Sequence, residues 1–296
     1  MHRRVTARRR LTATVAMSGA LLLTLTGCLG EEGTQDQGAG GAFKAAAAQF
    51  MAQVSDKTEQ ADTYSMRMVS TANMTVQSQK VETRTESRMQ VRLRPEPAMK
   101  GTVTTTMSGL DGLGAQAAQR PTEMVMIGGT IYMKLNLPQG GGSKPWLKMS
   151  LGDTGAEALA QAKQYGPAQM AQMLTASPDV HKVGEEVVEG VRTTHYAGTV
   201  DSNAGLGALS DKDRQELEKG LEKLGAGKMT IDIWVDEQGL PRKQIVKADM
   251  SLGTVDVTSH FSDYGRPVQV SAPPADQVGD FSSFLDDLGA PRFPGS

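Results

Sequence analysis

Arg88-Met89-Gln90-Val91-Arg92-Leu93-Arg94 is the stretch of this 296-residue chain that says most about its fold. Apolar and polar side chains alternate through it, and successive side chains of a β-strand point to opposite faces. The stretch therefore predicts a strand with one apolar face, formed by Met89, Val91 and Leu93, and one face of arginines and glutamine.

The same period of two recurs along the chain on both sides of this stretch. Tyr64, Met66 and Met68 alternate with polar residues and Val69, and residues 99–107 are rich in threonine and valine. Glycine pairs and charged turns separate further runs of this kind, as in hairpins. Strands are therefore predicted over residues 123–136 with a turn at Gly128-Gly129, 146–151, 180–201 with a turn at Glu189-Gly190, 229–235, 244–250 and 254–261, with a turn at residues 236–239 and a short extended run over residues 266–272.

Helical periodicity marks four other segments. In residues 43–60, Phe43, Ala47, Phe50 and Val54 recur at a spacing that puts them on one helix face. The other helices are predicted over residues 157–176, broken at Gly166-Pro167 and carrying Leu159, Met170 and Met173, then over residues 210–224 with a leucine stripe, and over residues 281–288.

Many short alternating strands with a few striped helices indicate the α+β class. Twisted strands of this kind curl, and helices with one apolar stripe need an apolar surface to cover. We therefore expect a large, curved, mostly antiparallel sheet, shaped as a half-barrel, with the helices covering its concave face.

The first 27 residues have the parts of a bacterial secretory signal. Five arginines lie among the first ten residues, and residues 13–26 are mostly apolar. This run is shorter than the roughly 20 residues of a spanning helix. It ends in Leu25-Thr26-Gly27-Cys28, which resembles the lipobox of bacterial lipoproteins. The resemblance implies cleavage before Cys28 and attachment of lipid to its thiol.

Cys28 is the single cysteine, so an exported chain could form no internal disulfide. A lipid-bearing cysteine explains its position better than the alternative, an ordinary signal peptide with an incidental cysteine. The adjacent arginines leave the twin-arginine export route open beside the general one. Residues 28–41, rich in Gly, Gln and Glu, are expected to form a flexible tether. Residues 42–276 would be the folded domain and residues 277–296 a C-terminal tail.

Composition argues against nucleic-acid binding. Loss of the signal takes away five arginines and leaves 26 basic against 33 acidic residues, a net charge of −7. Such a chain, with only 4% aromatic residues, offers no basic surface for nucleic acid. The 17 methionines are more typical of core packing than of a ligand site.

No catalytic motif is present, and no metal site or cofactor is predicted. His195 lies in a predicted strand with Asp201 downstream, and a lone strand histidine is usually structural. Asp232, Asp236 and Glu237 match no calcium-loop spacing, so solvation of a turn is the better interpretation.

Several short segments resemble actinobacterial lipoproteins of the LppX/LprG type, which share the fold of the periplasmic carrier LolA. The similarity runs from about Phe43 to Pro274, and it depends on the order of the segments. These segments are Ile131-Tyr132-Met133-Lys134, Trp146-Leu147-Lys148-Met149, residues 182–186, residues 188–191, Thr194-His195-Tyr196, residues 233–236 and residues 239–242.

The resemblance implies an apolar cavity between sheet and helices that holds acyl chains, and no catalytic residues. The leading hypothesis is a non-enzymatic lipoprotein, anchored through Cys28 on the extracytoplasmic face of the cell membrane, that binds or transfers lipid or lipoglycan. The alternative is a protein-interaction or envelope-sensing lipoprotein without a cavity. Candidate cavity-lining residues are Tyr64, Met66, Met68, Met89, Val91, Leu93, Leu159, Met170 and Met173.

Overall fold

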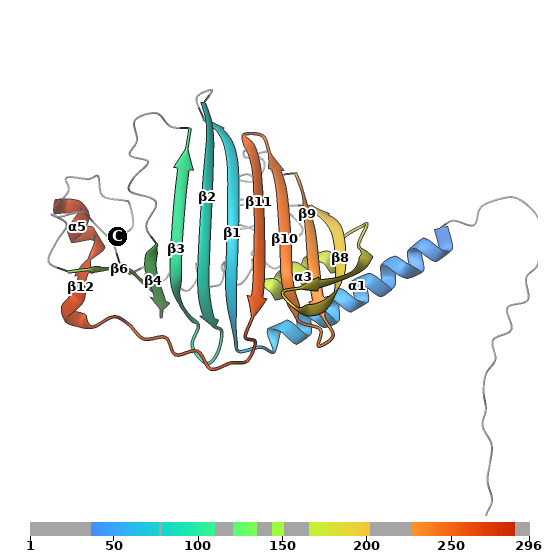
Figure 1. Ribbon diagram of the computed structural model, residues 1–296, viewed down its shortest axis with the longest axis horizontal. Coiled ribbons are helices and arrows are strands. Elements are labelled where there is room, and N and C mark those ends of the chain that lie inside the picture. The colour runs from blue at the N-terminus through green and yellow to red at the C-terminus, as the bar shows by residue number, and fades with distance from the viewer. Residues whose placement is uncertain are drawn as a thin grey trace, which may run out of the picture. The chain divides into compact units, whose positions relative to one another are not determined.

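A single sheet dominates the computed structural model, which describes residues 37–76, 79–109, 121–134, 144–150, 166–201 and 227–287. Its 12 strands are not closed into a barrel by any pairing within these residues, and β12 and β7 form the edges (Figure 1). Their order is β12 (Val278–Asp280), β6 (Trp146–Ser150), β5 (Thr130–Lys134), β4 (Thr122–Ile127), β3 (Ala98–Ser108), β2 (Gln79–Arg92), β1 (Thr63–Val76), β11 (Gly253–Ser262), β10 (Pro241–Met250), β9 (Lys228–Asp236), β8 (Val191–Asp201) and β7 (His181–Val188).

The predicted α+β class with a large sheet is confirmed, and one detail differs. All neighbouring strands pair antiparallel except β12, which lies parallel to β6. The sheet is therefore mixed. Short turns join several antiparallel neighbours, such as β1 to β2 and β9 to β10, whereas β1 also pairs with the distant β11, and β12 reaches β6 only after the long segment that follows β11 (Figure 1).

The register gives the sheet two chemically different faces. Met66 on β1 lies opposite Met89 on β2 and Phe261 on β11. One position along, Arg67 lies opposite Arg88 and His260. Directly paired residues share a face. We therefore call the face that carries Met66 the apolar face, and the face that carries Arg67 the polar face.

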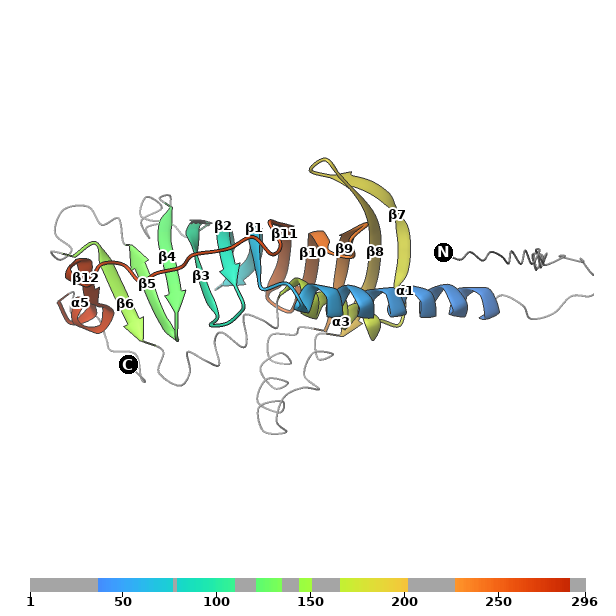
Figure 2. The same cartoon turned by 90° about the horizontal axis from the view of Figure 1, so that it is seen from below.

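Two helices pack on the apolar face at one end of the sheet. Residues of α1 (Gln37–Glu59) and α3 (Pro167–Thr175) form one buried cluster with residues of β8 and β9, and Val246 of β10 packs against it. Figure 2 shows both helices on the same side of these strands. We call this the helix-covered cluster, formed by Ala47, Met51, Val54, Met170, Ala171, Met173, Leu174, Val180, Tyr196, Val200, Ile231, Ile233 and Val235.

Covering of the whole concave face by helices, as the sequence led us to expect, is not confirmed. α1 and α3 cover β8 to β10. The first half of the predicted helix 157–176 and the predicted helix 210–224 lie outside the described residues. The half-barrel curvature also stays a prediction.

The expected face of α1 is correct in its middle and wrong at its start. Ala47 and Val54 are buried, and Met51 between them is fully inaccessible. Phe43, however, is 76% exposed, because the first turns of α1 extend beyond the strands that its later turns cover (Figure 1). The helix also begins at Gln37, inside the segment 28–41 predicted as a tether.

Two predicted turns are confirmed by their backbone conformations. Gly128 and Gly129 both have positive φ, and they join β4 to β5. Glu189 and Gly190 do the same between β7 and β8, with φ of 49° and 84°. Two consecutive residues of positive φ give the turn twist that matches a hairpin.

The C-terminal residues add structure where a tail was predicted. After β11 the chain follows the end of the sheet, where Gly265 N donates to Thr63 O (3.0 Å) and Thr63 Oγ1 to Arg266 O (2.7 Å). The short helix η2 (Ala275–Gln277) leads into β12, and α5 (Phe281–Asp287) follows, close to the predicted helix over residues 281–288.

Candidate functional site

A second apolar cluster occupies the middle of the apolar face, on β1, β2 and β11. Phe261 and Tyr264 both contact the ring of Tyr64, each with centroids 6.0 Å apart. Tyr64 is 8% exposed, and this burial raises the pKa of its phenol to about 12. We call this the central apolar cluster, formed by Tyr64, Met89, Val91 and Phe261 with Met66, Leu93, Met99, Val103, Met124 and Tyr264 packed against them.

The structure separates the predicted cavity-lining residues into two groups. Five lie in the central apolar cluster, namely Tyr64, Met66, Met89, Val91 and Leu93. Met68 shares their face, opposite Ser87 and Ser259. Met170 and Met173 lie instead in the helix-covered cluster. Leu159 and Cys28 lie outside the described residues.

An open pocket of about 600 Å³ lies over the middle strands, and Met66 and Met89, two of the predicted cavity-lining residues, are part of its lining. Most of its lining residues belong to the polar face. They form two adjacent rows that run across the strands, and most of the other lining residues lie between these rows. The lining consists of Ser65, Met66, Arg67, Arg88, Met89, Gln90, Lys100, Gly101, Thr102, Glu123, Met124, Val125, Trp146, Glu189, His260, Phe261 and Ser262.

The pocket was not predicted from the sequence, although the arginines of β2 were assigned to one face of a strand. Arg67 pairs with His260 across β1 and β11, and with Arg88 across β1 and β2. These pairings join strands that are far apart in the sequence. Alternation alone identifies a polar face, but it does not show which polar residues of different strands meet.

The tip of the β7–β8 hairpin supplies a carboxylate to this pocket. Glu189 forms an ion pair with Arg67, and its Oε1 lies 3.4 Å from His260 Nδ1. The hairpin tip rises on the side of the strands opposite α1 and α3 (Figure 2). It therefore reaches over the polar face from the far end of the sheet.

We expect His260 to titrate below its ordinary value of 6.5, because burial lowers the pKa of His260 and outweighs the attraction of Glu189. Arg67 and Lys243 lower it further. The neutral form is thus favoured on folding, so its contribution to stability is present above pH 6.5 and is lost as the pH falls. Imidazole NMR titration measures this, and Glu189→Gln should lower the pKa again whereas Arg67→Gln should raise it. A pKa above 6.5 in the unmodified chain would contradict this assignment.

His195 is held in a structural arrangement. Its Nε2 lies 2.7 Å from Asp232 Oδ1, and its ring stacks on Trp234 at 4.0 Å between centroids. Lys243 Nζ lies 4.1 Å from the centre of the Trp234 ring. The polar contacts of His195 found among the described residues are with the carboxylates of Asp232 and Glu186.

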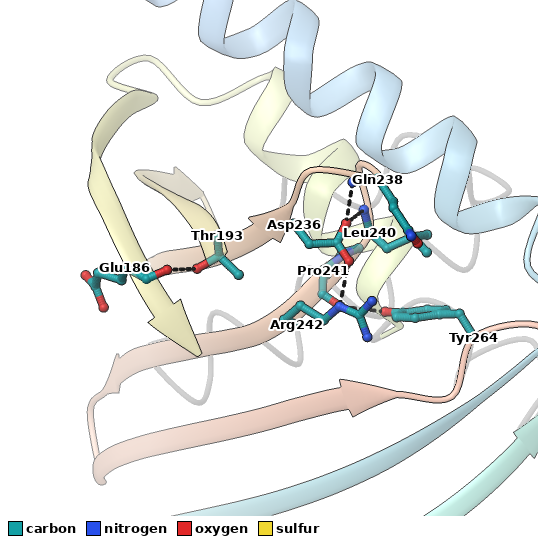
Figure 3. A network of polar contacts seen from close by, with 8 residues as sticks. All are labelled: Glu186, Thr193, Asp236, Gln238, Leu240, Pro241, Arg242 and Tyr264. Carbon is teal, nitrogen blue, oxygen red and sulfur yellow. Dashed lines mark hydrogen bonds and ion pairs between the residues drawn. The ribbon is translucent and has the colours of Figure 1, made fainter. Parts of the chain in front are cut away.

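Asp236 closes the β9–β10 turn (Figure 3). Its Oδ1 accepts hydrogen bonds from the backbone N–H of Gln238 and Leu240, both at 2.9 Å. Its Oδ2 accepts one from Arg242 Nε at 2.6 Å. The carboxylate therefore closes the turn from a buried position, with partners for both oxygens within the protein, instead of being solvated as the sequence indicated. Asp232 does not serve the turn, since it lies within β9 and contacts His195.

The described residues offer neither a metal site nor a membrane-spanning helix. They contain no group of three or more His, Cys, Asp or Glu side chains able to hold a metal ion. They also contain no helix that combines the length and hydropathy needed to cross a membrane.

The fold and its two faces define an α+β protein built on one large open sheet, with apolar clusters on one side and a charged pocket on the other. The profile of the LppX_LprAFG lipoprotein family matches residues 46–270, and the chain belongs to this family. The resemblance noted in the sequence is thereby confirmed.

Relatives of the chain occur in Streptomyces. A protein of Streptomyces coelicolor that is named as a lipoprotein, SCO4650, is 28% identical over 310 residues, covering 96% of this chain and 99% of its own. An uncharacterized 31.2 kDa protein of Streptomyces griseus is 38% identical over 160 residues, half of this chain and 52% of its own length.

Two solved structures are similar to the chain. LprF of Mycobacterium bovis has a TM-score of 0.48 at 17% identity, covering 77% of this chain and 97% of its own. LppX of Mycobacterium tuberculosis has a TM-score of 0.47 at 17% identity, covering 76% and 98%.

Proposed function

We propose that the chain is a non-enzymatic lipoprotein, anchored through Cys28 on the extracytoplasmic face of the cell membrane, that binds acyl chains on the apolar face of its sheet. The observation that supports this most is the position of the central apolar cluster. It lies on the same face as the helix-covered cluster, but α1 and α3 pack only at the other end.

The chemistry of this cluster suits acyl chains. Met66, Met99 and Met124 are partly accessible and pack against its buried core. Methionine side chains are flexible and adapt to irregular apolar ligands. Each square ångström of apolar surface removed from water contributes about 25 cal/mol, so an acyl chain lying along these strands would be held without polar contacts.

The anchor explains how such a surface would meet its ligand. A single acyl chain binds a membrane only marginally, whereas two or more on one residue hold it durably. Acylation of Cys28 would keep the protein at the membrane that contains its lipid ligands. Whether cargo is released again, and to which acceptor, depends on exchange with that membrane.

Native mass spectrometry of the chain expressed without its signal and lipid, from Gly30 onward, tests the proposal. We expect co-purifying lipid, or binding of a fluorescent fatty acid once bound lipid has been removed. A chain that carries no lipid and binds no fatty acid would rule out the carrier function.

Met66→Asp is expected to abolish most of this binding, because it places a carboxylate in the central apolar cluster. An unpaired charge among apolar side chains destabilises the cluster and weakens the binding of an acyl chain. Val69→Asp, three residues along the same strand and on the polar face, is the matched control and should keep its lipid. Fatty-acid titration of both variants, with circular dichroism to check folding, measures the effect. Equal loss in both, or in neither, would argue against the site.

One observation favours the alternative of a protein-interaction lipoprotein. Val183 and Val187 on the edge strand β7 are 52% and 71% exposed. Edge strands with accessible apolar side chains can receive a strand of another protein. Recovery of one stoichiometric protein partner with the lipid-free chain, lost on Val187→Lys, would favour this function instead.

A further inference from the structure

The pocket on the polar face contains a pair of like charges, which destabilises the sheet while no ligand is bound. Arg67 and Arg88 lie directly opposite each other on β1 and β2. Side chains so placed have Cβ atoms about 5 Å apart, and like charges there repel. His260 flanks Arg67 on its other side. Three nitrogen-bearing side chains therefore stand in one row, at the pocket wall.

Acidic side chains neutralise only part of this positive charge. Glu189 pairs with Arg67, and Glu123 pairs with Lys134 at 2.7 Å, at the other side of the pocket. Arg88 and Lys100 line the pocket without an acidic partner among the described residues. Among the described residues, the pocket thus has two cations without an acidic partner and one arginine whose carboxylate comes from a hairpin tip.

The remaining walls are of a different kind. Trp146 and Val125, both about 9% exposed, lie on β6 and β4. Gln90 and Thr102 add neutral hydrogen-bonding groups between them and the arginines. A volume of about 600 Å³ lies in the range of small-molecule sites, roughly 300–1,000 Å³, so the pocket is too large for a bare anion alone.

We propose that this pocket binds a phosphate group carried on a small polar body such as glycerol or a sugar, and that Glu189 occupies Arg67 until the ligand displaces it. Guanidinium groups form paired hydrogen bonds with phosphate oxygens. The phosphate would lie between Arg67 and Arg88 and relieve their repulsion, with Lys100 as a third cation. The polar body would extend over Gln90 and Thr102 toward Trp146.

This site goes beyond the proposed acyl-binding function. The arginine row lies on the polar face and the central apolar cluster on the apolar face of the same strands, and Met66, Met89, Met124 and Phe261 of the cluster also line the pocket. Arg88→Gln changes only the polar face and should therefore leave fatty-acid binding intact. The phosphate could belong to a lipid headgroup or to a soluble phosphate ester, and both offer the same chemistry to Arg67 and Arg88.

Isothermal titration calorimetry of the full chain, purified in a neutral detergent, tests the proposal with sn-glycerol 3-phosphate and inorganic phosphate as probes. We expect glycerol 3-phosphate to bind more tightly than inorganic phosphate. Arg88→Gln should weaken binding at least about tenfold, since it removes charged hydrogen bonds. The affinity of Arg88→Lys should lie between those of the unmodified protein and Arg88→Gln, because lysine keeps the charge but lacks the paired N–H donors of the guanidinium. Glu189→Gln should tighten binding several-fold by removing the internal competitor.

Arg84→Gln is the matched control, because it removes the same charge from the same face of β2 at a position outside the pocket lining, where Arg84 pairs with Glu86. It should change binding less than about twofold. Adding phosphatidylglycerol to the micelles separates the two sources. Competition with glycerol 3-phosphate identifies a lipid headgroup, and absence of competition, with phosphatidylcholine as reference, identifies a soluble ester.

Three results would overturn the proposal. One is an absence of binding heat for both probes at millimolar concentration. Another is an equal loss of affinity in Arg84→Gln and Arg88→Gln, which would show diffuse attraction. The third is weaker binding in Glu189→Gln, which would show that Glu189 supports the ligand instead of competing with it.

Discussion

Replacing Asp236 by alanine is expected to lower the free energy of unfolding by about 3 kcal/mol. The carboxylate is 3% exposed and accepts hydrogen bonds from two turn N–H groups and from Arg242. Its loss leaves all three donors without their acceptor, and removal of one partner from a buried ion pair costs about 3–5 kcal/mol. Arg242 is 21% exposed, so water can partly replace the acceptor, which places the effect at the lower end of that range.

The turn also supports the central apolar cluster, which makes the loss cooperative. Tyr264, a member of that cluster, donates a hydrogen bond from its hydroxyl to Pro241 O at 2.9 Å. The guanidinium of Arg242 lies 5.8 Å from the centre of the Tyr264 ring. Burial raises the pKa of Tyr264 well above its ordinary value of 10, so the phenol remains a donor across the neutral range.

Urea unfolding of the Asp236→Ala variant measures this effect, and Asp256→Ala is its control. Asp256 pairs with Lys247 at 3.8 Å with both side chains largely exposed, and such pairs contribute at most about 1 kcal/mol. Asp236→Asn should fall between, because its amide oxygen can still accept from the turn. A loss of less than about 1 kcal/mol in Asp236→Ala would mean that water already satisfies this turn.

The alternation in Arg88–Arg94 was enough to predict β2 and its apolar face, but it underestimated the length of the strand. β2 begins at Gln79, and its first half places Thr83 and Thr85 where an apolar face would carry methionine or valine. A hydrophobic period of two does not identify such residues as part of a strand. They are held by the backbone ladder and by cross-strand contacts, as between Thr85 and Thr105, whose hydroxyls are 3.3 Å apart.

Other features depend on tertiary structure and leave no local pattern. β12 is only three residues long, and its parallel pairing with β6 follows from where the preceding segment ends. Phe43 continues the apolar spacing of α1, but it is exposed because the spacing does not show where the sheet ends. The Arg67–Arg88 pair likewise required the strand register. Local sequence predicted elements and faces well, and contacts between distant strands poorly.

Leu174→Ala is expected to lower the free energy of unfolding by about 3 kcal/mol, because it removes the centre of the helix-covered cluster. Leu174 on α3 is fully inaccessible, and so are Ile231 and Ile233 on β9. Truncating a buried leucine to alanine costs about 2–5 kcal/mol, and the cost is higher where the site cannot collapse.

The close approach of α3 to β8 makes collapse difficult. A methyl group at Gly198 would lie 3.0 Å from Leu174 Cδ2 and 2.6 Å from Ser177 Oγ. Ser177 Oγ in turn donates to Thr199 O at 2.9 Å. The backbone of β8 and the end of α3 are therefore already in contact. Only side chains can move into the space that Leu174 leaves.

Leu252→Ala is the matched control for this prediction, since the same atoms are removed from a leucine that is 47% exposed in the β10–β11 turn. It should change stability by less than about 0.5 kcal/mol. Thermal and urea unfolding of both variants measure the difference. If α3 is anchored as the structure shows, Leu174→Ala should also increase amide exchange in residues 167–175 more than in β1, because local opening of α3 then requires less free energy. Equal stability of the two variants would mean that α3 contributes little to the fold, and that the sheet is held by its strand pairing and by α1.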